Sequence, residues 1–153
     1  NIINHSHILK INLKNSNVLD LYSGIGSFGL ECASREAKKI TFVEENKNIV
    51  KVLEKNFNNL KINNAVIIAD KVVNFLNLNL NENFEIIFLD PPFAKKDYLR
   101  ELKMIKKKRI YKNKHVVIIH REKNSTNDWE EVISPLIVKV YGRSKIIFGR
   151  FLD

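Results

Sequence analysis

Five short apolar runs alternate with segments of helical periodicity, and this alternation restricts the chain to few folds. The runs span five to seven residues, are continuous, and are rich in β-branched and aromatic side chains: 18–22, 40–44, 65–70, 84–90 and 115–120. Continuous runs of this kind are typical of strands buried on both faces of a parallel sheet. The intervening segments are long enough for helices that connect parallel strands: 28–38, 46–60, 71–78 and 97–108.

The end of the chain has a different pattern. Residues 136–151 contain two extended runs joined across Gly142, which predicts an antiparallel hairpin. Alternating strands and helices followed by a hairpin predict an α/β fold, with a doubly wound, mostly parallel sheet and a C-terminal antiparallel hairpin. We expect one domain over residues 1–153, with a helix or strand at 1–14 packed before the first core strand.

Length and composition exclude several classes of protein. A chain of 153 residues can bury about two-thirds of its unfolded surface, so it needs no disulfide or metal to stabilise its core. Cys32 is the single cysteine, which excludes an intrachain disulfide and favours a reducing compartment. No apolar stretch approaches the ~18 residues of a membrane span, and no signal segment opens the chain. We therefore expect a cytoplasmic monomer with no membrane partner.

The net charge of +9 is concentrated in one segment. Residues 95–114 carry ten Lys and Arg against two acids, a net charge of +8. A local positive field of this kind attracts polyanions, above all nucleic acid. The alternative is a bias toward A/T-rich codons, which would also enrich lysine on a solvated helix face.

The loop after the first strand has the composition of a nucleotide-binding loop. Gly24 and Gly26 allow a tight turn and close approach of a ligand, next to the N-terminus of a helix. Glu44 ends the second strand, where a carboxylate can accept both hydroxyls of a ribose. With Gly29, the same residues satisfy the dinucleotide fingerprint, so a nicotinamide or flavin enzyme stays an alternative.

Two further carboxylates favour S-adenosylmethionine over a dinucleotide. Asp20 lies in the end of the first strand, where it can order the loop and meet the cationic amino-acid portion of that cofactor. Asp70 ends the third strand and can accept a hydrogen bond from the adenine amino group. A pyrophosphate would be repelled by so many carboxylates at successive strand ends.

The fourth strand ends in Asp90-Pro91-Pro92-Phe93, the most specific motif of the chain. Two consecutive prolines hold the corner rigid, so Asp90 and the Pro91 carbonyl can accept hydrogen bonds from an exocyclic amine. Phe93 offers a face for a flat base. Such an amine is a weak nucleophile and a methyl sulfonium is a strong electrophile, so positioning and the Asp90 charge can supply most of the rate.

The motifs at 20–31, 42–46, 88–93 and 139–148 together resemble RsmD-type bacterial enzymes, which methylate the guanine N2 amine in 16S ribosomal RNA. The resemblance implies a class I, Rossmann-like methyltransferase fold, S-adenosylmethionine as cofactor, and 16S RNA or a 30S assembly intermediate as partner. It implies target-base contacts at Asp90, Pro91 and Phe93, within a catalytic corner that includes Pro92. The expected cofactor residues, with Ser23 added from the same loop, are Asp20, Tyr22, Ser23, Gly24, Gly26, Glu44 and Asp70.

The family has a basic N-terminal segment before the point where this sequence begins, and we expect the chain to lack it. In this interpretation Lys95–Lys114 would grip the phosphates that flank a flipped guanine. Two alternatives stay open: another exocyclic-amine methyltransferase, acting on DNA or other RNA at adenine N6 or cytosine N4, and a non-catalytic RNA-binding module of the same fold. The histidines and Cys32 lack metal-ligand spacing, so we expect no metal.

Overall fold

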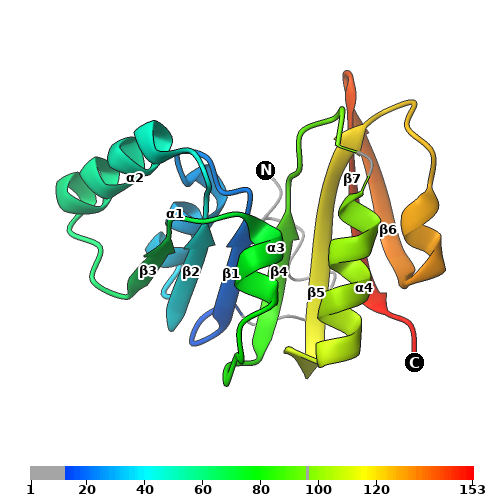
Figure 1. Cartoon of the computed structure of the whole chain (residues 1–153), viewed down its shortest axis with the longest axis horizontal. Coiled ribbons are helices and arrows are strands. Elements are labelled where there is room, and N and C mark those ends of the chain that lie inside the picture. Colours follow the sequence, from blue (N-terminus) through cyan, green and yellow to red (C-terminus); the bar gives the residue numbers. More distant parts are fainter. Residues whose placement is uncertain (1–12, 96) are drawn as a thin grey trace.

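A seven-stranded sheet forms the centre of the computed structural model, which describes residues 13–95 and 97–153 (Figure 1). The strand order is β3-β2-β1-β4-β5-β7-β6. The strands are β1 (Asn17–Leu21), β2 (Lys39–Val43), β3 (Ala65–Ile68), β4 (Phe84–Leu89), β5 (Tyr111–Glu122), β6 (Ile133–Tyr141) and β7 (Ser144–Phe151). Strands β1 to β5 pair in parallel, and β7 pairs antiparallel with both β5 and β6. The predicted fold class is confirmed.

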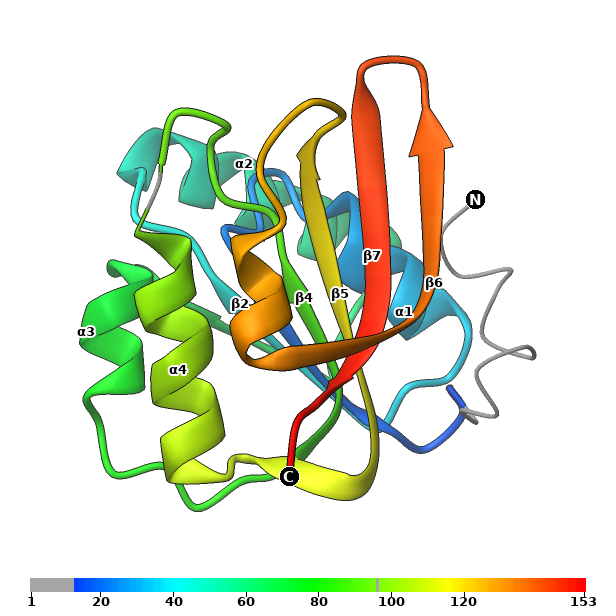
Figure 2. The ribbon, with the colours of Figure 1, turned by 90° about the vertical axis from the view of Figure 1, so that its right-hand side faces the viewer.

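The helices cover both faces of the sheet (Figures 1 and 2). They are α1 (Ser27–Ser34), α2 (Lys47–Leu60), α3 (Val72–Leu76), α4 (Tyr98–Lys108) and the short 3-10 helix η2 (Asp128–Glu131). One core cluster joins the sheet to α3, α4 and η2, and a second joins its other face to α1 and α2. In β1, Leu19 and Leu21 belong to the first cluster and Val18 to the second. Burial on both faces explains the continuous apolar runs.

Helix α2 illustrates how local sequence sets the boundaries of an element. The Asn46 side chain accepts hydrogen bonds from two backbone N–H groups of the first turn, at 3.0 and 3.2 Å. Val50 and Leu53 are buried against the sheet. The helix ends at Leu60, and the left-handed backbone of the next residue, Lys61 (φ 54°), terminates the hydrogen-bond ladder. The bounds agree with the predicted segment 46–60.

The C-terminal hairpin turns at Gly142, which has a φ of +54° and open space where a side chain would lie. The predicted 136–151 hairpin is therefore confirmed, although its first strand begins earlier, at Ile133. The return strand β7 lies between β5 and β6, so the last strand of the sequence is not the edge of the sheet. Strand β5 also extends beyond the predicted 115–120 at both ends.

The sheet order reverses at β1, which pairs with β2 on one side and β4 on the other. In open α/β sheets such a reversal leaves a crevice at the carboxyl ends of the strands, where ligands bind. The predicted element at 1–14 lies outside the described residues except for its last two positions, Leu13 and Lys14. Within the described part of the chain, no helix is long and apolar enough to cross a membrane.

Candidate functional site

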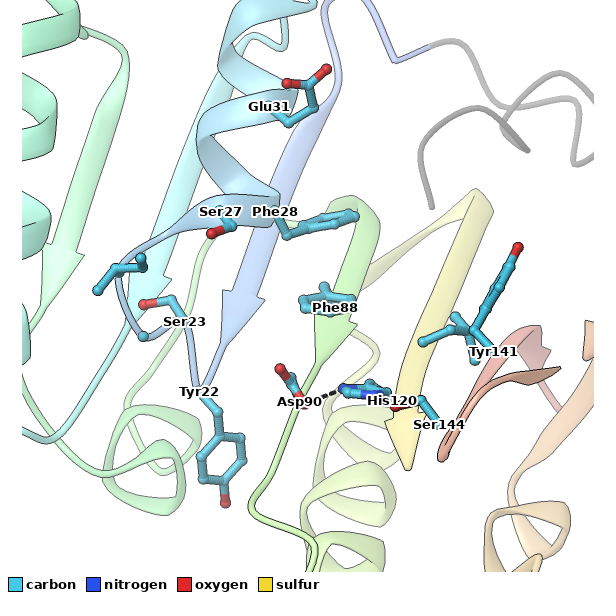
Figure 3. A pocket seen from close by; sticks show the side chains of 13 residues that line it. Tyr22, Ser23, Ser27, Phe28, Glu31, Phe88, Asp90, His120, Tyr141 and Ser144 are labelled. Atoms are coloured by element: carbon cyan, nitrogen blue, oxygen red, sulfur yellow. Dashed lines mark hydrogen bonds and ion pairs between the residues drawn. The ribbon is translucent and has the colours of Figure 1, made fainter. Parts of the chain in front are cut away.

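Two hollows meet at the carboxyl edge of the sheet and share Tyr22, Asp90 and His120. The first, of about 730 Å³, extends over the loop after β1, the start of α1 and the β6–β7 hairpin (Figure 3). The second, of about 690 Å³, extends toward the residues after β2 and the corner after β4. The crevice predicted by the strand order is therefore present, and Asp90 lies where its two halves join.

The loop after β1 is fixed by the carboxylate of Glu44. One carboxylate oxygen accepts from the backbone N–H of Gly24 at 2.8 Å, and the other accepts from Asn46 at 3.0 Å. The loop turns through left-handed conformations at Tyr22, Gly24 and Gly26. A Cβ at Gly24 would meet nothing within 4 Å, so this glycine borders open space inside the first hollow. Glu44 borders the second hollow.

Asp20 lies behind the loop rather than on its surface. It is 1% exposed and borders neither hollow, and its Oδ2 accepts from the backbone N–H of Gly29 at 3.1 Å. Its Oδ1 has no hydrogen-bond partner among the described residues. Burial raises the pKa of this carboxyl well above its usual range. The structure thus explains how Asp20 orders the loop, but the Asp20 side chain does not reach either hollow.

Tyr22 connects the loop to helix α4. Its hydroxyl donates to the carboxylate of Glu101, with both oxygens at 2.6 Å. Glu101 is 3% exposed, and burial raises its pKa, while the hydrogen bond from Tyr22 acts in the opposite direction. Ser23, beside Tyr22, borders the first hollow, and its buried Oγ has no hydrogen-bond partner within the described chain.

The corner Asp90–Phe93 follows β4 directly, and its ring and carboxylate reach solvent. Phe93 is 43% exposed and the Asp90 side chain 39%. A buried arginine, Arg121 at the end of β5, holds the corner from behind. Its guanidinium donates to the carbonyls of Pro91, Pro92, Phe93 and Lys95 at 3.1 to 3.4 Å and stacks over the Tyr98 ring. The Pro91 carbonyl therefore already has one donor.

His120, next to Arg121, contacts the corner from the side that faces the hollows. Its Nδ1 lies 2.8 Å from Asp90 Oδ1 (Figure 3). Its ring is edge-on to Phe93, with 5.4 Å between the ring centroids. Sequence reasoning discarded His120 because it matched no metal pattern, and it missed Arg121. The rule that residues at the ends of parallel strands converge, applied to the fifth strand as to the first four, would have found both.

Asp70 does not join this group. It borders neither hollow and is exposed, and it accepts from the Asn74 side chain at 2.8 Å and the Lys71 backbone at 2.7 Å. These hydrogen bonds, that from Asn74 first, lower its pKa. In this structure Asp70 thus organises the start of α3.

The basic segment 95–114 is spread along the molecule. Lys95 lies beside the corner, but α4 then leads away from the carboxyl edge, and its 11 residues span about 16 Å. Residues 106–109 consequently lie toward the opposite edge of the sheet (Figures 1 and 2). Lys103 and Lys112 form ion pairs with acids of the same chain. Helical rise thus separates the ends of the run, and its first residues are the ones that lie near Phe93.

No group of three metal-ligating side chains that could hold an ion occurs in residues 13–95 and 97–153.

Comparison with known proteins identifies the family. The family model described as Conserved hypothetical protein 95 matches residues 1–150. A curated relative, "Ribosomal RNA small subunit methyltransferase D" of Buchnera aphidicola, is 32% identical over 114 residues, 74% of this chain. The match spans 60% of that relative's length.

Solved structures show the same architecture. A Haemophilus influenzae structure superposes with a TM-score of 0.86 at 27% identity, covering 99% of this chain and 98% of the other. A methyltransferase crystallised with S-adenosylhomocysteine (SAH) has a TM-score of 0.77 at 16% identity, covering 95% of this chain and 48% of the other. The fold is that of class I methyltransferases. With its motifs, its fold and a family match over residues 1–150, the chain belongs to the Conserved hypothetical protein 95 family, that of the RsmD-type proteins.

Proposed function

We propose that this chain is an S-adenosylmethionine-dependent methyltransferase that methylates the exocyclic N2 amine of a guanine in 16S ribosomal RNA. The observation that carries the proposal is the meeting of two hollows at Asp90, at the point where the Asp-Pro-Pro-Phe corner follows β4. A cofactor and a base can lie side by side along the two joined hollows, with their reacting atoms beside the same carboxylate. The rRNA methyltransferase relative supports this substrate class, and guanine N2 follows from the resemblance of the motifs.

The donor set of the site fits the proposed cofactor. Gly24 borders open space, and each Glu44 oxygen has a lone pair left after its one backbone hydrogen bond, so it can accept from ribose hydroxyls. Tyr22, Ser23 and Gly26 would shape the same loop around the ligand. Asp20 would act through the loop it orders, and Asp70 would reach the adenine only by leaving its hydrogen bond to Asn74. When bound, the cofactor supplies an electrophilic methyl group on a sulfonium.

The corner would orient the amine that accepts this methyl. Asp90 would accept a hydrogen bond from the amine and stabilise the positive charge that develops on nitrogen. The Pro91 carbonyl, which has a second lone pair beyond the one facing Arg121, would accept the other amine hydrogen. Pro92 stiffens the corner, and Phe93 would stack on the base. The proton left on nitrogen after transfer would go to water or pass transiently to Asp90.

The RNA would reach this edge from solvent, and Lys95 and Arg100, at the start of the basic segment, would contact its phosphates. Activity on ribosomal RNA implies a cytoplasmic protein, and we propose that it acts as a monomer through one continuous domain. The substrate is naked 16S RNA or a 30S assembly intermediate.

The test is methyl transfer from labelled S-adenosylmethionine to 16S RNA and to 30S intermediates, followed by mass analysis of the nucleosides. We expect N2-methylguanine. Asp90→Ala should abolish transfer while SAH affinity, measured by calorimetry, changes less than threefold. The matched control is Asp128→Ala, because Asp128 is an exposed aspartate on η2. Retained turnover in Asp90→Ala would reject the role of Asp90.

The same assay separates the alternatives. Methylated adenine or cytosine in DNA or RNA would replace the guanine assignment with another exocyclic-amine methyltransferase. RNA binding without transfer to any of these substrates would identify a non-catalytic module. NADH binding by a folded chain that does not bind SAH would point to a dinucleotide enzyme.

A further inference from the structure

We infer that His120 is a positioning residue, which fixes one carboxylate oxygen of Asp90 so that the other points at the target amine. This inference rests on the proposed function. It concerns a histidine to which the sequence motifs assign no role.

The first observation is the contact itself. His120 Nδ1 lies 2.8 Å from Asp90 Oδ1, a short distance for a nitrogen donor and a carboxylate acceptor. An ionised carboxylate has only acceptors, so Nδ1 carries the hydrogen and donates it. Within the described chain no other side chain donates to Asp90. Its Oδ2 therefore retains its acceptor capacity for a ligand.

The second observation is that His120 cannot easily turn away. It belongs to β5, where its backbone is paired in register with Ile146 of β7 on one side, and β4 lies on the other. Its side chain is 24% exposed, and its ring meets Phe93 edge to face. The strand thus sets the ring position, and the ring sets the carboxylate.

The third observation is that other contacts restrain the Asp90 carboxylate only weakly. The Asp90 side chain is 39% exposed and follows the last residue of β4, so packing restrains its χ1 and χ2 angles only in part. Arg121 holds the backbone of the corner through four carbonyls, but it does not contact the carboxylate. Arg121 therefore orients the backbone of the corner, and the neighbouring His120 orients the Asp90 carboxylate.

The rate of methyl transfer depends steeply on the geometry of the reacting groups. Displacing a reacting group by about 1 Å can lower the rate about 100-fold, because the productive arrangement becomes rare. Loss of His120 should therefore lower kcat. It should leave KM for RNA nearly unchanged, because phosphate contacts and stacking supply most of that affinity.

The variants separate the two ring nitrogens. His120→Asn places a donor near the position of Nδ1, whereas His120→Ala removes both nitrogens. We expect His120→Ala to lower kcat by about 10- to 100-fold, with KM for RNA and SAH affinity within threefold of wild type. His120→Asn should recover kcat to within about threefold. The matched control is His115→Asn on the same strand, whose partners are the Lys112 carbonyl and the Phe151 N–H, away from both hollows.

A second measurement does not depend on turnover. Nitrogen-15 NMR of the histidine rings should show His120 with its hydrogen on Nδ1, and Asp90→Ala should shift that resonance while leaving His115 unchanged. An Nδ1 without a hydrogen would overturn the inference, as would equal kcat in wild type and His120→Ala, or a kcat in His120→Asn as low as in His120→Ala. A wild-type protein that binds SAH but methylates no nucleic acid would instead overturn the proposed function, and the inference with it.

Discussion

Replacing Gly29 with alanine should destabilise the protein, although alanine is the better helix former. Gly29 lies in the first turn of α1, and its N–H donates to the buried Asp20. A Cβ there would lie 2.3 and 2.6 Å from two ring carbons of Phe42 and 3.0 Å from Asp20 Oδ2. Ordinary carbon contacts lie at about 3.5–4.0 Å, so the overlap with the ring is at least about 1.2 Å.

The Phe42 ring has little room to retreat. It is fully buried and packs against Phe57, with 5.1 Å between ring centroids. Overpacking of this kind costs about 1–3 kcal/mol, and a weakened hydrogen bond to Asp20 adds about 1 kcal/mol. The better helix propensity of alanine returns about 1 kcal/mol. The net loss in free energy of unfolding is about 1–3 kcal/mol, or roughly 2–12 °C in Tm for a chain of this size.

Urea unfolding followed by circular dichroism measures this loss. Gly142→Ala is a reference without steric overlap: its Cβ meets nothing within 4 Å, so its cost of about 1–2 kcal/mol comes from the positive φ alone. Phe42→Leu should cost less in the Gly29→Ala background than in wild type, because the smaller side chain relieves the overlap. Unchanged or increased stability of Gly29→Ala, or strict additivity with Phe42→Leu, would refute the packing argument.

Substitutions at Asp20, at Arg121 and at the Tyr22–Glu101 pair test the supports of the site. Because burial raises the pKa of Asp20, the folded state binds its proton more tightly than the unfolded state, and stability falls as pH rises above the ordinary aspartate pKa. In urea melts across pH, Asp20→Asn should reduce that fall, and an unchanged pH profile would contradict this origin. Arg121→Met leaves the carbonyls of 91–95 without their donor and should lower the free energy of unfolding by about 2–4 kcal/mol, with Arg121→Lys intermediate. A melt of Arg121→Met identical to wild type would argue against the clamp. Tyr22→Phe leaves the buried Glu101 carboxylate without its hydrogen-bond donor and should lower the free energy of unfolding by about 1–3 kcal/mol. Adding Glu101→Gln to the same chain should partly restore it. Thermal melts of the double-mutant cycle would show this coupling.

Much of the fold could be predicted because the apolar runs, the helical periodicity and the capping residues all indicate the same strands and helices. The run VLDLY is continuous because β1 is covered on both faces, and Asn46 caps α2 at the residue where helical periodicity begins. The extent of β5 could not be predicted, since its first residues, from Tyr111, are polar. Tyr111 pairs with Phe84 of β4, which is a long-range contact, and the register shifts before the next pair, Ile86 with Val116.

A place at the candidate site could be predicted where the position of a strand end alone brings a residue to the hollows. Glu44 and Asp90 reach the hollows for that reason. Asp20 and Asp70 also lie at strand ends, but they accept hydrogen bonds from the nearby Gly29 backbone and the Asn74 side chain. Such local hydrogen bonds leave no periodic pattern in the sequence. Tyr22 contacts Glu101 from 79 residues away in sequence, and only the folded arrangement reveals that pair.

The buried guanidinium of Arg121 has a consequence for the thermodynamics of ligand recognition. Ordering a flexible loop costs roughly 1–2 kcal/mol for each residue, and a loop that orders on contact with its ligand subtracts this cost from the affinity. In this protein the segment from Pro91 to Lys95 is already ordered by contacts within the chain. Its conformational entropy is lost during folding, so the base that we propose as ligand would meet a rigid surface. Association at this corner should therefore be of the lock-and-key kind.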